Sequence, residues 1–182
     1  MKKILSAIMC IVMILGIAAC GGGNDDVKET QTTIEQIDPV NVLTANDVYE
    51  ALEFEYVPVV DGGVIVHEDN TSKAVYVSEP KGKNDSVEIK ITQMTDKIDA
   101  QSVKAQYDAT MAKRSDTIEV ANLGESAYIA FPSIYVYDRG CVIKITAGSG
   151  NSSEQQNLLM ALATKAVTNF EAIVPPLSEG NN

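Results

Sequence analysis

Apolar and polar residues alternate along several short stretches of this chain, and such a period of two predicts β-strands. In residues 87–92, Val87, Ile89 and Ile91 alternate with polar residues, which is typical of a strand that buries one face. Further strands are predicted over residues 63–67, 73–78, 117–121, 127–131, 134–137 and 141–147. Short polar turns join most of these runs, so we expect the strands to pair as an antiparallel sheet.

Three other stretches carry apolar residues three and four positions apart, the spacing of one face of a helix. The first follows Thr44, the expected N-cap, which has Asp47 three residues on as its partner in a capping box. The second is predicted over residues 100–114. The third begins with Ser153 as its N-cap, has the strongest apolar face in the chain and is ended by the two prolines at 175–176.

The predicted order of elements is α-β-β-β-α-β-β-β-β-α, which indicates an α+β fold with one antiparallel sheet packed by helices. We assign this domain to residues 41–174. Residues 20–40 are expected to form a flexible tether, because they are mostly polar and have little apolar surface to bury. A flexible chain of this length spans about 25 Å. Residues 175–182 are expected to form an irregular tail.

The beginning of the chain has the pattern of a leader for export. Two lysines precede an apolar run over residues 4–17, which is shorter than the roughly 20 residues that span a membrane. Two alanines then lead into Cys20. The segment 16–20 resembles the lipobox of bacterial lipoproteins, and residues 1–19 are then the signal peptide.

That resemblance implies a lipoprotein that is cleaved before Cys20 and anchored on the extracytoplasmic side of the cell membrane. A diacylglyceryl group on the Cys20 thiol, together with palmitate, would hold it there. One acyl chain contributes only about 0.8 kcal/mol per buried CH₂, so stable anchoring needs two or more. An ordinary secretory signal cut near Ala19 is the alternative. A cysteine directly after Ile-Ala-Ala favours lipidation, because its thiol is the atom that is acylated.

The net charge of the chain limits the classes of partner that we expect it to bind. Without Lys2 and Lys3, 12 of the 14 basic residues remain against 25 acidic ones, so the processed chain has a net charge of −13. Such a chain repels phosphate backbones, and no nucleic-acid partner is expected. It also repels anionic lipid surfaces, so attachment to the membrane is expected through the lipid.

Candidate catalytic chemistry is sparse. His67 is the only histidine, so the usual zinc ligand sets and a serine-histidine-aspartate triad have little to draw on. Cys10 and Cys20 precede the domain, so Cys141 has no cysteine partner within it, and by parity it shares a strand face with Ile143 and Ile145. We therefore expect Cys141 to be a core residue. The sequence predicts no enzyme activity, no cofactor and no metal site.

Two tyrosines invite two interpretations. Tyr135 and Tyr137 alternate with Ile134 and Val136, so they share the strand face opposite those aliphatic residues. If that face is open, the pair marks a contact surface. If helices cover both faces of the sheet, the pair belongs to the core, which is the interpretation we favour.

The segment Leu123-Gly124-Glu125-Ser126-Ala127, within residues 120–128, resembles a leucine-glycine-acid-x-alanine signature. With the strands and long helix that follow, residues 44–172 resemble small bacterial lipoproteins that have a PsbP-like α/β/α sandwich. The resemblance implies that fold and supplies no catalytic residues. Independently of it, Gly124 lies between two predicted strands, where a positive φ or a close backbone approach would exclude a side chain.

The sequence thus predicts a membrane-anchored extracytoplasmic lipoprotein that acts as a non-catalytic binding or accessory module for an envelope protein or a small ligand. One alternative is a structural or assembly subunit of an envelope complex. Another is a cofactor-free hydrolase that uses carboxylates, which would need a deep pocket and a carboxylate with a strongly shifted pKa.

Overall fold

The computed structural model describes residues 36–53, 56–58, 66–68, 70–78, 86–93 and 100–176. The predicted signal peptide, Cys20 and the tether up to residue 35 lie outside the described residues, as does the predicted tail from residue 177. All described residues belong to one unit, Thr33–Asn182. None of the helices in these ranges is long and apolar enough to cross a membrane.

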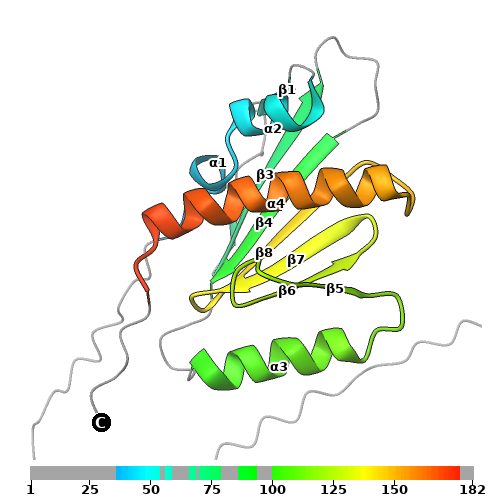
Figure 1. The fold of residues 1–182 in the computed structure, drawn as a ribbon. Coiled ribbons are helices and arrows are strands. Elements are labelled where there is room, and N and C mark those ends of the chain that lie inside the picture. The colour runs from blue at the N-terminus through cyan, green and yellow to red at the C-terminus, as the bar shows by residue number, and fades with distance from the viewer. Residues whose placement is uncertain are drawn as a thin grey trace, which may run out of the picture. The chain divides into compact units, whose positions relative to one another are not determined.

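The described chain folds into helices and strands of the predicted α+β class (Figure 1). The helices are α1 (Pro39–Val42), α2 (Ala45–Leu52), α3 (Ala100–Ala112) and α4 (Ser153–Ile173). The strands are β1 (Tyr56–Pro58), β2 (Val66–Glu68), β3 (Thr71–Ser78), β4 (Ser86–Gln93), β5 (Ile118–Val120), β6 (Ser126–Ala130), β7 (Ser133–Asp138) and β8 (Cys141–Ala147). The predicted order lacked α1 and β1. A helix of one turn is too short to show a period, and Tyr56-Val57-Pro58 has no alternation of apolar and polar residues and carries a proline.

Capping sets the helix ends. The predicted capping box of α2 is confirmed: the Asp47 amide donates to Thr44 Oγ1 at 3.1 Å, and the Thr44 amide donates to Asp47 Oδ2 at 2.9 Å. The predicted cap of α4 was wrong by one residue, because Ser152 accepts from the Gln155 amide at 3.2 Å. Buried Gln155, which donates to the Ala147 carbonyl, fixes this choice between two neighbouring serines.

Helix α3, which was predicted over residues 100–114, ends at Ala112, two residues before the predicted end. Arg114 lies in the turn beyond it, where its amide donates to the Met111 carbonyl at 3.0 Å. Its guanidinium binds Asp116 with two hydrogen bonds, at 3.0 and 3.1 Å. Arg114 thus pairs with a carboxylate in the turn that follows the helix.

The strands form one antiparallel sheet in the order β1-β3-β4-β8-β7-β6-β5, and β2 also pairs with β3. Pairing is in register across the centre of the sheet: Ile145 on β8 is opposite Ile89 on β4 and Ile134 on β7. Strand β4 therefore joins the β3–β4 hairpin to the β5–β8 meander, although α3 and β5–β7 separate it from β8 in the chain.

One side of the sheet, here called the isoleucine face, is covered by α1, α2 and α4. Residues Ile89, Ile91, Ile143 and Ile145 are fully buried on it and share one core with residues of these helices, including Phe170. Helix α4 runs across the strands on this side (Figure 1).

The start of this layer is tied to the sheet by polar contacts. The Ile37 amide donates to Gln93 Oε1 at 2.8 Å, and Ser72 Oγ donates to the Ile37 carbonyl at 2.7 Å. The Tyr76 hydroxyl donates to the Leu43 carbonyl. Residues 37–40, which the sequence assigned to the tether, are therefore attached to the sheet.

The other side of the sheet, here called the opposite face, carries α3 over β6, β7 and β8. Tyr107 and Met111 of α3 form a second apolar cluster with Tyr137 of β7. The rings of Tyr107 and Tyr137 stack with centroids 5.7 Å apart, and Tyr128 meets the Tyr107 ring edge-on at 5.9 Å. Helices thus lie on both faces of this half of the sheet.

Candidate functional site

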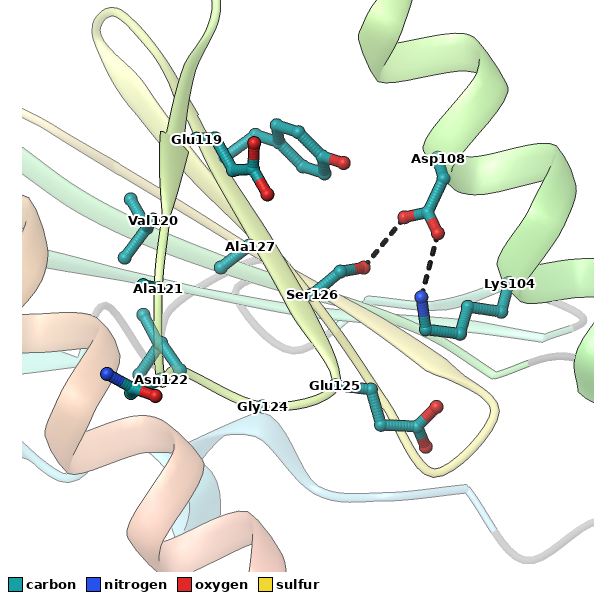
Figure 2. A pocket seen from close by; sticks show the side chains of 12 residues that line it. Lys104, Asp108, Glu119, Val120, Ala121, Asn122, Gly124, Glu125, Ser126 and Ala127 are labelled. Carbon is teal, nitrogen blue, oxygen red and sulfur yellow. Dashed lines mark hydrogen bonds and ion pairs between the residues drawn. The ribbon is translucent and has the colours of Figure 1, made fainter.

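The corner between β5 and β6 lines a cleft of about 240 Å³ with α3. All nine residues of the segment 120–128 border this cleft, together with Glu119 of β5 and with Lys104 and Asp108 of α3 (Figure 2). The segment that carries the leucine-glycine-acid-x-alanine pattern is therefore also the main wall of the cleft.

Gly124 shapes the corner for the reason that its position suggested. Its φ is +59°, and a Cβ there would lie 2.6 Å from Val136 Cγ1 and 2.9 Å from the Tyr137 carbonyl oxygen. The close approach allows the next amide, that of Glu125, to donate to the same Tyr137 carbonyl at 3.0 Å. Both expectations for Gly124, the positive φ and the close approach, are confirmed.

The other residues of the pattern divide into core and surface. Leu123 and Ala127 are buried in the core of the isoleucine face, which anchors both ends of the corner. Glu125 Oε1 accepts from the Arg139 amide at 3.0 Å and so ties the corner to the β7–β8 turn. The pattern is thus a structural corner, as predicted, and it leaves Ser126 and Tyr128 facing α3.

Asp108 is the central polar group of the cleft. Figure 2 shows its carboxylate between Ser126 of β6 and Lys104, one turn earlier in α3. Ser126 Oγ donates to Asp108 Oδ1 at 2.9 Å, and Lys104 Nζ donates to Asp108 Oδ2 at 2.7 Å. The two oxygens are therefore fixed by partners from two different elements.

The contacts within the cleft shift the pKa values of Asp108, Lys104 and Tyr128. Partial burial raises the pKa of Asp108, but hydrogen bonds from Lys104 and Ser126 and the Lys104 charge outweigh it, so the pKa is lowered. The same hydrogen bond raises the pKa of Lys104. Burial and the nearby Asp108 charge raise the pKa of the Tyr128 phenol. At neutral pH the cleft holds an ionised acid, an ammonium and a neutral phenol.

The charges around the cleft do not balance. Among the described residues that line the cleft, Asp108, Glu119 and Glu125 supply three carboxylates, and Lys104 is the one cation. The cleft therefore favours a ligand that carries a positive charge and hydrogen-bond donors.

No family model, curated protein or solved structure matches this chain. The geometry of the cleft and the sequence therefore carry the functional assignment.

The two tyrosines singled out in the sequence have different environments. Tyr137 is fully buried beneath α3 and presents no surface for a contact. Tyr135 is partly buried at the margin of the same cluster, and its ring has Arg114 at 5.9 Å and Lys144 at 5.8 Å from its centroid. The pair thus belongs mainly to the core, with only the Tyr135 ring reaching the surface.

Of the remaining candidate residues, Cys141 has no reactive setting, and the structure describes only the strand position of His67. Cys141 is buried, as expected for a core residue, and burial followed by the Asp138 charge raises the pKa of its thiol to about 12. His67 lies on β2, where it pairs in register with Ser72. Within the described ranges, no group of three His, Cys, Asp or Glu residues is placed to hold a metal ion.

Sequence analysis did not identify Lys104 and Asp108. Their i, i+4 spacing is a common surface pair on a helix. Only the placement of α3 beside β6 makes them part of a site, and that placement depends on contacts between distant segments.

Proposed function

We propose that this chain is a lipid-anchored protein on the extracytoplasmic side of the cell membrane, and that its domain binds a cationic small ligand or peptide group in the cleft of residues 119–128 and α3. The observation that carries the proposal is the Asp108 carboxylate, fixed by Lys104 and Ser126 in a cleft where carboxylates outnumber cations. Such a preorganised polar site recognises a ligand without rearranging.

Binding fits this site better than catalysis does. A carboxylate with a lowered pKa is a weak general base and is not protonated at neutral pH, so it is also a poor general acid. The cleft contains a serine hydroxyl, but that hydroxyl donates to Asp108, and the described residues that line the cleft include no histidine. These features argue against the carboxylate hydrolase and support a non-catalytic binding or accessory module.

The fold assignment supports the same proposal. Helices α1, α2 and α4 on one face and α3 on the other make the three layers expected of a PsbP-like α/β/α sandwich. The layering and the corner motif at 120–128 are the two features that favour this family. A domain of this kind, held near the membrane by Cys20, would meet its ligand at the cell surface.

The anchor is tested by Cys20→Ala in the full chain, with Cys10→Ala in the apolar run as the matched control. We expect Cys20→Ala to move the protein from the membrane fraction to the soluble fraction, because it removes the acylated thiol. The control should stay with the membrane. If both variants remain in the membrane fraction, Cys20 is not the anchor.

A further inference from the structure

The opposite face of the sheet is only half covered by the described helices. Helix α3 packs on residues of β6, β7 and β8, whereas the outward residues of β3 and β4 remain partly exposed. On β4, for example, Val87, Ile89 and Ile91 are buried on the isoleucine face, and the residues between them are partly exposed. The half of the opposite face that β3 and β4 form is therefore accessible.

A row of lysines crosses the open half. In the strand register, Lys73 of β3 is directly opposite Lys90 of β4, and Lys90 is directly opposite Lys144 of β8. Neighbouring strands are about 4.8 Å apart, and like charges directly opposite each other destabilise a sheet. Three consecutive lysines in one such row therefore need an explanation other than the stability of the sheet.

Contacts within the described residues neutralise only one of these charges. Lys73 forms an ion pair with Glu88 at 3.3 Å. The Lys144 ammonium faces the Tyr135 ring, which carries no charge, with Arg114 on the same ring. Lys90, the middle member, has no ion pair with any described residue.

The row also has the opposite sign to the chain as a whole. The chain has a formal net charge of −11, and Lys73, Lys90, Lys144 and Arg114 are four of its 14 basic residues. A basic patch on an acidic protein selects an acidic partner by charge complementarity, while the remainder of the surface repels that partner.

The shape of the patch favours a narrow partner over a flat one. From Lys73 to Lys144 the row crosses two strand spacings, about 10 Å, which is close to the width of one α-helix. Helix α3 stands beside the row and rises about 10 Å above the sheet. A helix can lie next to α3 on this face, whereas α3 would hold a planar bilayer away from the lysines. Val75 and Val77 are partly exposed on the same face and offer apolar contacts.

We infer that the lysine row, Lys73, Lys90 and Lys144, is a docking surface for an acidic amphipathic helix of a partner protein. The helix lies beside α3, with its carboxylates on the lysine ammoniums and its apolar side on the valines of β3. This surface is separate from the cleft and does not depend on the anchor at Cys20.

The test uses a fluorescein-labelled amphipathic peptide of glutamate, alanine and leucine, its glutamine analogue, and the full chain in detergent. Fluorescence anisotropy should show binding of the glutamate peptide at least ten-fold tighter than that of the glutamine peptide. Lys90→Glu with Lys144→Glu should weaken binding at least ten-fold. Lys165→Glu on α4 makes the same kind of charge change on the other side of the sheet and should alter binding less than two-fold.

Thermal unfolding separates binding from folding. Lys90→Glu places an acid between Lys73 and Lys144, so its melting temperature should equal or exceed that of the wild type while binding is lost. If the reversed variants fail to fold, the Lys90→Gln and Lys144→Gln pair takes their place, and its binding should still fall several-fold.

Four results would overturn the inference. The first is equal affinity for the two peptides, and the second is equal weakening by Lys165→Glu. The third is binding of the wild type to phosphatidylglycerol vesicles but not to the glutamate peptide, which would assign the row to the membrane surface. The fourth is a dimer that the double variant dissociates, which would make a second copy of this chain the occupant.

Discussion

Residues of the strands point alternately to the two faces of the sheet, but the helices cover the two faces to different extents. On the isoleucine face, three helices cover the sheet, and the inward apolar residues of β4 and β8 are buried. On the opposite face, burial is complete only beneath α3, where Tyr137 lies, and Lys73, Lys90 and Lys144 remain partly exposed. The first face thus stabilises the domain, and the second combines core packing under α3 with exposed polar groups.

Both surfaces that we connect with binding lie on the opposite face. The cleft is formed where α3 meets β6, through Asp108, Ser126 and Lys104, and the lysine row lies on the part of the face that α3 leaves open. Partial cover by one helix therefore creates a negative site and a positive surface on the same side of the sheet.

The largest effect is expected from truncating the core beneath α3. Tyr137→Ala should lower the free energy of unfolding by about 3–5 kcal/mol, because it removes a fully buried ring that stacks on Tyr107. Tyr135→Ala, at the margin, should cost only about 1 kcal/mol, since it loses weak contacts with Arg114 and Lys144. Urea denaturation followed by circular dichroism measures both. Equal small losses would mean that α3 does not form a core with this face.

The next largest effect is expected at the corner between β5 and β6. Gly124→Ala should destabilise the domain by about 2–4 kcal/mol, because it combines a positive φ with overlap on Val136 and the Tyr137 carbonyl. Gly150→Ala is the matched control: its φ is +93°, but no atom lies within 4 Å of the added Cβ. Its loss should be smaller, about 1–2 kcal/mol. The same denaturation curves would contradict this account if Gly150→Ala were the more damaging change.

A smaller effect concerns the one carboxylate buried at the end of β7. Asp138 is 4% exposed, and its Oδ2 has no hydrogen-bond partner among the described residues, with Arg139 Nε 4.0 Å away. Burial, followed by the nearby Glu171 charge, raises the pKa of Asp138. Asp138→Asn should therefore stabilise the domain by about 1 kcal/mol at pH 7, since it removes a buried charge that has only a 4.0 Å ion pair and no hydrogen bond on Oδ2.

The stability gained by Asp138→Asn should depend on pH, and the direction of that dependence follows from the raised pKa. A folded state that holds the Asp138 proton more tightly than the unfolded chain gains stability from that group as the pH falls through the raised pKa. The advantage of Asp138→Asn should thus shrink between pH 7 and pH 4 in thermal unfolding experiments. An advantage that grows toward acid would show that ionised Asp138 is stabilised in the fold.

Local sequence patterns predicted many of the helices, strands and turns of this structure. The alternation at Val87, Ile89 and Ile91, the capping box at Thr44 and the positive φ of Gly124 each depend on neighbouring residues, and each was predicted. Helix α1 was missed because a single turn shows no period, and strand β1 was missed because Tyr56-Val57-Pro58 does not alternate and carries a proline.

The polar surfaces on the opposite face could not be predicted in the same way. Lys73, Lys90 and Lys144 are far apart in the chain, and only the register of three strands aligns them. Similarly, Asp108 and Ser126 are 18 residues apart and meet because α3 folds back onto the meander. Long-range topology, which no local period encodes, creates both surfaces.

The claim that the cleft binds a cationic group is tested most directly by ¹H–¹⁵N NMR, with arginine amide titrated into the full Cys20→Ala chain. We predict saturable shifts in residues 104–108 and 119–128, and their loss in Asp108→Asn. Glu50→Gln, which removes the exposed partner of Lys165 at 2.7 Å, should leave the shifts unchanged. Shifts spread over the acidic surface, or equal shifts in Asp108→Asn, would contradict the assignment of the cleft as the binding site.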